Sequence, residues 1–574
     1  MSPYIKIFST LFFCFVLNSV KAQSTFLNQG DKSTRFIERL EIKQQRNTNL
    51  NFSTVKPFSR KDIVKEVEFL DSARMGYTDS TGVDKFAEWT DLDLSAVDEY
   101  NMRSLLMNNS EWVTSARDDF QSQKPLLKAF YKTQANMIEV NEKDFFLAVN
   151  PVLHITQAVE PGYSEGIFLN SRGVNVRGMI AKKVGFSSII TDNQERGPQF
   201  FQQKVAELRA VPGYGFYKEF KRTGVDYFDA RGYFTFGAAK EHINVQFGYD
   251  KNFIGNGYRS LYLSDWGNSN LFLKVKTKIW KLQYQNLFME LMPQFVKTRD
   301  TLLDRKYAAM HHLSINVTKW LNVGLFEGII FGRRNRFDFQ YLNPVIFYRH
   351  VEGTIGSPDN ALAGLDFKAN VAHMFQFYGQ FILDEFRIND LRKKPDSWVN
   401  KYGYQLGVKY VDAFSVRNLD LQFETNRVRP FTYSHFDSVA NYTHYNQPLA
   451  HPLGANFQEY IAKIYYQPAP RWVLDATLIY YDKGLDTLNK NFGGNIFKDY
   501  RTRSGDDGFF VTNGAKANAF NAFVTVSYEL KQNLFFEASF QHRNFTIANT
   551  PGESRTTIVT AGIRLNAFKR QYDY

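Results

Sequence analysis

The feature that most constrains this chain is a strict alternation of apolar and polar residues, which recurs many times after about residue 145. In residues 271–279, leucine, valine and isoleucine alternate with three lysines: Lys274, Lys276 and Lys278. Similar runs occupy residues 242–249, 280–285, 375–384, 524–530 and 559–566. Because successive side chains of a β-strand point to opposite sides, this period of two predicts strands with one apolar and one polar face.

Two architectures contain such strands: a soluble sandwich, which buries the apolar face, and an outer-membrane barrel, which turns it toward lipid. Many of the runs reach about nine to eleven residues, which is the length of a tilted membrane strand. Their apolar faces often end in an aromatic residue, and short turns alternate with long polar loops such as 435–457 and 483–514. These features favour the barrel. We predict an all-β transmembrane outer-membrane β-barrel over residues 145–574, with about 18 antiparallel strands.

Residues 1–22 predict export. A positively charged start is followed by an apolar stretch at 7–20 and by small residues before position 23, as in a cleaved signal peptide. An uncleaved anchor helix is the alternative. The one cysteine, Cys14, lies inside the apolar stretch and not at the cleavage site, which argues against a lipoprotein. Cleavage would remove two lysines and no acidic residue, so the net charge of +12 would fall by two, to +10.

The region between the signal peptide and the barrel has two parts. Residues 23–58 are polar, and we predict a flexible N-terminal segment there. Residues 59–144 carry apolar residues at helical spacing, which predicts amphipathic helices over 59–75, 84–108 and 125–139. We expect these helices to form a periplasmic region or a plug for the barrel. An independent soluble linker domain is the alternative.

The sequence has none of the compact motifs of zinc hydrolases, serine hydrolases or phosphate-binding loops. The segment Gly255–Gly257 lacks the third glycine of a dinucleotide fingerprint and is interpreted as a short turn. His435, His444 and His451 share one loop, but their spacings of nine and seven match no compact metal motif. We therefore predict no enzyme activity, no cofactor and no metal site. A barrel enzyme that acts on lipid or glycan is the alternative.

Several loop segments combine tyrosine, arginine, asparagine and histidine more densely than a turn requires. Such a mixture suits sugars, because aromatic faces stack on pyranose rings while arginine binds hydroxyls and carboxylates. The candidate glycan-binding residues are Asp250, Lys251, Tyr258, Arg259, Arg349, Arg427, Arg429, Tyr433, His435, Tyr442 and His444. The three lysines of residues 271–279 would add positive charge inside the barrel and attract an anionic ligand. The alternative is an internal network that only satisfies polar groups in the lumen.

Three segments together resemble a known family. They are residues 250–265, the run Asn343–Arg349 followed by Gly356–Asn360, and residues 429–456. In their order and spacing they are similar to the Wzi-like capsule-assembly outer-membrane proteins, and most closely to the RemB-type gliding-motility branch. The resemblance implies a large barrel, a helical periplasmic element and a lectin-like role in holding surface polysaccharide. For the gliding branch it implies a part in cell-surface motility, and it supplies no catalytic residues.

These observations leave two classes of function. The first is a non-enzymatic outer-membrane barrel that binds or helps to assemble a cell-surface polysaccharide, which we expect to be anionic. The second is a porin-like diffusion channel. Expected partners are the polysaccharide, outer-membrane lipid and lipopolysaccharide, and motility or capsule-export proteins, with no role for nucleic acid.

Overall fold

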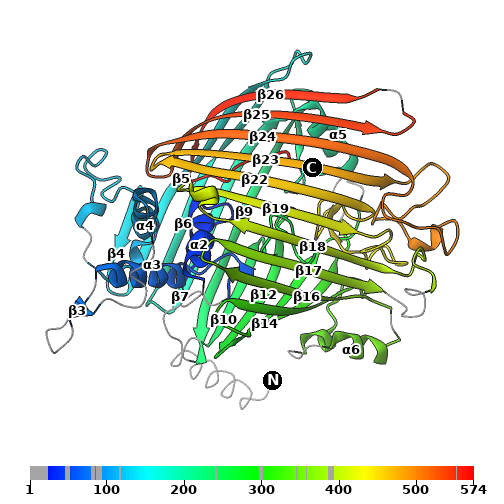
Figure 1. The fold of residues 1–574 in the computed structure, drawn as a ribbon, viewed down its shortest axis with the longest axis horizontal. Helices are drawn as coiled ribbons and strands as arrows, with labels where there is room; N and C mark the ends of the chain where they lie inside the picture. Colours follow the sequence, from blue (N-terminus) through cyan, green and yellow to red (C-terminus); the bar gives the residue numbers. More distant parts are fainter. Residues whose placement is uncertain are drawn as a thin grey trace.

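The chain folds around one closed antiparallel β-barrel (Figure 1). The computed structural model describes residues 24–45, 52–75, 77–78, 84–85, 93–115, 118–239, 242–295, 302–343, 347–356, 358–385, 393–550 and 552–574. The barrel sheet contains twenty strands, of which β4 (Ile138–Asn141) and β8 (Lys218–Phe220) each pair with a single neighbour. The other 18 form the closed wall, because β26 pairs with β5 and β7 pairs with β9. The predicted fold class is confirmed.

The wall strands follow one another around the barrel in chain order. They are β5 (Phe145–Val159), β6 (Ile167–Ile180), β7 (Val184–Arg196), β9 (Gly224–Ala238), β10 (Ile243–Asp250), β12 (Asn270–Ile279), β13 (Leu282–Leu291), β14 (Lys306–Asn316), β15 (Leu321–Phe331), β16 (Asn360–Val371), β17 (Phe375–Glu385), β18 (Lys401–Tyr410), β19 (Leu419–Val428), β22 (Phe457–Ala469), β23 (Trp472–Leu485), β24 (Ala515–Lys531), β25 (Leu534–Ile547) and β26 (Ser554–Leu565).

The strand register follows from the alternation in the sequence. Lys274 lies opposite Gln246 on one side and Leu287 on the other, and all three side chains point into the barrel. One residue earlier, Leu273 lies opposite Phe247 and Phe288 on the outer face. A slip by one residue would move every apolar side chain to the wrong face, so the register is strongly specified.

The two ends of the barrel differ in their connections. At one end, the short-turn end, neighbouring strands are joined by tight turns such as residues 372–374 and 470–471. At the other, the long-loop end, the connections are long, as in residues 332–359, 429–456 and 486–514. Helices α2, α3 and α4 gather at the short-turn end, on the left of Figure 1. No helix among the described residues is long and apolar enough to cross a membrane.

Three helices form a small bundle with a core of its own. They are α2 (Lys32–Gln44), α3 (Arg60–Met75) and α4 (Ala96–Asn108). Ser95 and Asp98 form a capping box at the start of α4, which satisfies two backbone donors that a helix end leaves free. The apolar faces of the helices meet in one buried cluster that includes Phe36, Leu40, Ile63, Val67, Leu105 and Leu106.

The N-terminal predictions are confirmed only in part. A helix occupies residues 60–75 as expected, but of the helix predicted over 84–108 only residues 96–108 are helical, and residues 84–85 form strand β3. Helix α2 lies in the predicted flexible segment. The helix predicted over 125–139 is absent: Leu127, Lys128 and Tyr131 have left-handed backbone angles, and strand β4 follows. Leu127 is 79% exposed, so this segment has no continuous buried face to stabilise a helix. Residues 1–22 and 86–92 lie outside the described residues.

The lumen is filled by protein. Residues 251–269 and 429–456 fold back into the barrel and pack against wall residues in one large apolar cluster. The ring of Tyr262 stacks on that of Phe326 in β15, with centroids 4.4 Å apart. The expected short turn at Gly255–Gly257 lies inside the lumen, beside β11 (Phe253–Ile254), which pairs with β1 (Val55–Lys56). A Cβ atom on Gly257 would approach the carboxylate of Glu424 to 2.4 Å and the carbonyl of Arg259 to 2.9 Å, so any larger residue would displace its neighbours here.

Candidate functional site

Most of the predicted glycan-binding residues hold the lumen together. Tyr433 and Tyr442 stack with ring centroids 5.4 Å apart, and both side chains are buried. The Tyr433 hydroxyl donates to the carbonyl of Leu261 at 2.8 Å, and the Tyr442 hydroxyl donates to that of Tyr262 at 2.6 Å. Burial raises the pKa of both phenols. These two tyrosines therefore join the 429–456 loop to the 251–269 loop and offer no free face to a sugar.

The predicted arginines inside the barrel are also engaged. The Arg259 guanidinium lies 2.9 Å from the carboxylate of Asp573, which also accepts a hydrogen bond from the Tyr258 hydroxyl at 2.5 Å. These contacts fix the C-terminal residues inside the lumen. Arg429 donates to three backbone carbonyl groups, those of Ser397, Asn400 and Phe509. Replacing Arg429 and Tyr442 by alanine would therefore loosen the packing of the loops. A change in ligand binding in that variant would not show that these side chains contact the ligand.

The three loop histidines do not come together. Nε2 of His444 bonds to the carbonyl of Ser269 at 3.0 Å, and burial lowers the pKa of His444 to about 4. His435 accepts a hydrogen bond from the backbone N–H of Asp437. His451 lies 2.6 Å from Glu459. Among the residues that the structure describes, no three His, Cys, Asp or Glu side chains are grouped closely enough to hold a metal ion.

The predicted lysines of the lumen face inward, but onto other parts of the chain. Nζ of Lys274 donates to Asn252 at 2.9 Å, and Lys276 lies 5.7 Å from the ring centre of Phe26. Lys278 is half-buried near the end of the same strand. Lys251 donates to two backbone carbonyl groups, and burial lowers its pKa to about 7. Lys251 and Lys274 thus bond to other parts of the chain inside the barrel, and Lys276 lies against an aromatic ring.

The remaining candidates do not share a site. Asp250 ends strand β10, where its carboxylate accepts the backbone N–H of Lys251. Arg427 is exposed on the outer face of β19, whereas its neighbours Asn426 and Val428 are buried inside. Arg349 is 66% exposed and lies in α6 (Tyr348–Thr354), outside the barrel wall. The eleven predicted residues are thus divided between the lumen and the outer surface.

A cavity opens at the long-loop end. It has a volume of about 820 Å³, which is enough for a small oligosaccharide. Its walls come from six parts of the chain: the end of α5 (Gln199–Leu208) with Arg209, Trp266, residues 293–295, Asp304, the 438–454 segment and residues 483–498. Its lining includes none of the eleven predicted residues.

Two amide side chains hold this cavity open. Asn446 donates to the carbonyl groups of Leu208 and Phe295 and accepts the backbone N–H of Phe295. Tyr445 and Asn446 both have positive φ angles, which suits a tight hairpin turn between β20 (Thr443–His444) and β21 (Gln447–Pro448). Gln447 donates to the carbonyl of Tyr214 at 2.6 Å. Charged lining residues support the wall as well: Lys483 donates to the carbonyl of Leu453 at 2.6 Å, and Asp486 accepts the backbone N–H of Phe492 at 2.9 Å.

The cavity combines aromatic and charged groups. Trp266 and Phe497 lie on its wall, partly buried against the neighbouring apolar clusters. The charged lining residues are the cations Lys204, Arg209, Lys483 and Lys498 and the anions Glu207, Asp304 and Asp486. Lys498 pairs with Asp486 at 3.0 Å, and Lys204 pairs with Glu207 at 3.0 Å. The side chains of Lys498 and Glu207 stay exposed, whereas that of Asp486 is buried. Such a surface can stack on a sugar ring and bind its hydroxyl or carboxylate groups.

Sequence reasoning missed these cavity residues. Trp266 directly follows the 250–265 segment, and Phe497 and Lys498 lie in the long polar loop 483–514. Neither position belongs to the segments in which the candidate glycan-binding residues are dense. The available signal was an isolated aromatic residue within a polar loop. The predicted segments had a denser mixture of the same residue types, but that density serves internal packing.

Comparisons with known proteins find outer-membrane β-barrels that are similar to this chain. The family model of capsule assembly protein Wzi matches residues 230–557, more than half of the chain. The structure of Wzi from Escherichia coli, described as a carbohydrate-binding β-barrel, is similar, with a TM-score of 0.56 and 13% identity, covering 96% of this chain and 100% of that chain. OprD from Pseudomonas aeruginosa has a TM-score of 0.41 and 9% identity, covering 73% of this chain and 95% of that chain. No curated protein sequence matches this chain.

Proposed function

Since the chain belongs to the Wzi capsule assembly family, we propose that it is a non-enzymatic outer-membrane barrel that binds cell-surface polysaccharide at its long-loop end. The observation that carries the proposal is the 820 Å³ cavity, which is walled by aromatic and charged side chains. A relative with the same fold is a carbohydrate-binding barrel that takes part in capsule assembly. We propose that this chain acts similarly, as a surface anchor for a glycan.

The packed lumen favours binding over transport. A diffusion channel needs a continuous water-filled path, whereas the loops, the N-terminal segment and the C-terminal residues of this chain meet in buried clusters inside the wall. The cavity at the long-loop end thus resembles a pocket with a protein floor. We expect purified protein in planar bilayers to conduct far less than an open barrel of 18 strands.

We propose a cleaved signal peptide at residues 1–22, a helical periplasmic region that ends near residue 144 and a barrel that spans the outer membrane. We propose anionic polysaccharide as the ligand, because the described cavity lining has four cations and three anions. From the three sequence segments, we also propose that the chain belongs to the gliding-motility branch and that capsule-export or motility proteins are its partners.

The proposal is tested by polysaccharide retention on cells. We expect the double variant Trp266→Ala/Phe497→Ala to release surface polysaccharide into the medium while its surface level stays normal. Phe510→Ala is the matched control, because Phe510 lies in the same 486–514 connection and is 53% exposed but does not line the cavity. Equal retention by the wild type, the double variant and the control would remove the cavity from polysaccharide binding.

A further inference from the structure

One connection folds over the outside of the barrel instead of into it. Residues 332–343 and 347–356, which we call the lateral arm, contain η4 (Phe339–Leu342) and helix α6. Figure 1 shows α6 beside the wall, toward the long-loop end. The ring of Tyr341 lies 4.7 Å from that of Phe331 in β15, and the ring of Phe337 lies 5.5 Å from that of Tyr307 in β14. The arm is therefore packed against the wall and does not project freely.

The wall beneath the arm has an unusual outer face. Asn286, His311 and Glu327 lie side by side across β13, β14 and β15. His312, the next residue on β14, bonds to Asp366 inside the lumen, so His311 and its two neighbours point outward. The outward positions around this polar row are apolar, namely Ala309, Leu313, Leu325 and Ile329. Polar groups on a lipid-facing wall are costly, so the row requires a cover.

The arm provides that cover through specific bonds. The Glu327 carboxylate accepts hydrogen bonds from the backbone N–H groups of Phe347 and Arg349, at 2.5 and 3.1 Å. The hydroxyl of Tyr348 is hydrogen-bonded to Nε2 of His311. His311 is fully buried even though it lies on the outer face of the barrel. The polar row thus serves to fix the arm at a defined place on the wall.

The free side of the arm carries two kinds of side chain. Phe339 is 77% exposed, Phe347 is 71% exposed and Leu342 is 39% exposed. Arg334 and Arg336 are exposed on the same arm. Of the nearby acids, Asp338 and Asp359 pair with Arg333 and Glu352 pairs with Arg349, while the exposed Asp304 accepts a hydrogen bond from Asn335. The arm therefore presents large apolar groups together with an excess of positive charge.

We propose that the lateral arm binds the phosphorylated headgroup of an anionic membrane lipid. Arg334 and Arg336 would contact the phosphate groups, and Phe339 and Phe347 would enter the acyl-chain region beside them. An acidic polysaccharide would match the arginines but would leave the exposed aromatic side chains in water, so the combination favours an amphiphile. The proposal rests on the outer-membrane placement proposed above, but it does not depend on glycan binding at the cavity.

The test measures lipid affinity of the purified full chain in neutral detergent micelles that contain fluorescent diphosphorylated lipid A. We expect Arg334→Gln/Arg336→Gln to bind roughly tenfold more weakly, since each basic residue near an anionic lipid surface contributes a few-fold. Phe339→Ser/Phe347→Ser should also weaken binding. The control, Arg501→Gln/Lys516→Gln, removes two exposed charges from another part of the long-loop end and should bind as the wild type does.

Two results would overturn the proposal. The first is equal lipid affinity of the wild type and the Arg334→Gln/Arg336→Gln variant. The second is a loss of dextran sulfate binding in that variant while lipid A binding is retained, which would assign the arginines to a soluble polyanion. Glycan binding at the cavity is measured with different variants. A lack of glycan binding would therefore not change the interpretation of the lipid A measurement.

Discussion

The two ends of the barrel are closed by different kinds of interaction. At the short-turn end, charged side chains of α2 meet opposite charges of the wall: Glu38 pairs with Lys409, Glu41 with Lys368 and Arg39 with Asp420. At the long-loop end, amide and arginine side chains donate mainly to backbone carbonyl groups, as Asn446 and Arg429 do. The short-turn end is thus closed by buried ion pairs, whereas the long-loop end keeps charged groups beside an open cavity.

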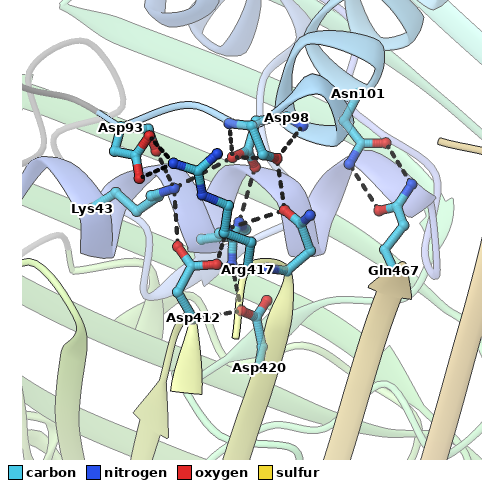
Figure 2. A network of polar contacts seen from close by, with 11 residues as sticks. Lys43, Asp93, Asp98, Asn101, Asp412, Arg417, Asp420 and Gln467 are labelled. Atoms are coloured by element: carbon cyan, nitrogen blue, oxygen red, sulfur yellow. Dashed lines mark hydrogen bonds and ion pairs between the residues drawn. The ribbon is translucent and has the colours of Figure 1, made fainter. Parts of the chain in front are cut away.

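This contrast suggests a division of roles. Arg39 is 6% exposed and contacts three carboxylates, those of Asp98, Asp412 and Asp420. Figure 2 shows Lys43 of α2 beside Asp412, in the turn between β18 and β19, and Asp420 of β19. Buried pairs of this kind cost desolvation energy but fix one arrangement, because a broken pair leaves an unpaired buried charge. We infer that the short-turn end is a fixed seal and that the long-loop end is the binding end.

The largest expected effect comes from breaking the seal. We expect Arg39→Met to destabilise the closed position of α2 by about 3–5 kcal/mol, because the buried carboxylates of Asp98 and Asp420 and the half-buried one of Asp412 lose their common partner. Hydrogen exchange of residues 32–44 measures this change. The matched control is Arg417→Met, which breaks an exposed pair with Asp93 and should cost about 1 kcal/mol or less. Similar exchange in the two variants would contradict a seal made of buried ion pairs.

A smaller effect is expected from acid. Burial alone would raise the pKa of Asp98, but Arg39 and Lys43 outweigh it and hold that pKa below its usual value. The pKa of Asp412 is lowered in the same way, with Arg39 as the main opposing partner. Their contribution to stability is therefore complete above about pH 4 and is lost as pH falls through the lowered values. Exchange of α2, corrected for intrinsic rates, should rise below about pH 4 while exchange of the wall strands does not.

At the other end, the hairpin that supports the cavity should respond locally. We expect Asn446→Ala to cost about 1–3 kcal/mol, because two backbone carbonyl groups lose their buried donor. Exchange should rise in residues 443–448 and at the end of α5, and α2 should stay protected. If exchange in α2 rose as much as exchange in residues 443–448, the two ends would be coupled. That result would contradict the account in which each end is closed independently.

The barrel was predictable because its signal is local. Alternation within residues 271–279 or 524–530 fixes which side chains face outward, and the strand count follows from the length of the region. The contents of the lumen were not predictable in this way. Arg259 meets Asp573, 314 residues later, and no local pattern indicates that pairing. The charged residues of α2 looked like a solvated segment because their partners lie on β16 and β18.

The predicted glycan residues show a second limit. Tyr433, Tyr442 and Arg429 are residue types that are common in sugar-binding sites. The same types also suit an internal network, because sugar sites and internal networks both use aromatic ring faces and the forked donors of arginine. Burial distinguishes the two cases, and burial depends on how the 429–456 loop folds. Trp266 and Phe497, which line the cavity, stand in segments of ordinary loop composition.

The most direct test of the account is calorimetric titration of the purified protein with oligosaccharides cut from the surface polysaccharide of its own cells. We expect saturable binding that Trp266→Ala/Phe497→Ala weakens by at least about thirtyfold, because truncating a central aromatic contact typically costs about 2 kcal/mol or more. Phe510→Ala and Arg39→Met should bind nearly as the wild type does. Unchanged affinity in the cavity variant, or its loss in Arg39→Met alone, would contradict a binding role for the long-loop end.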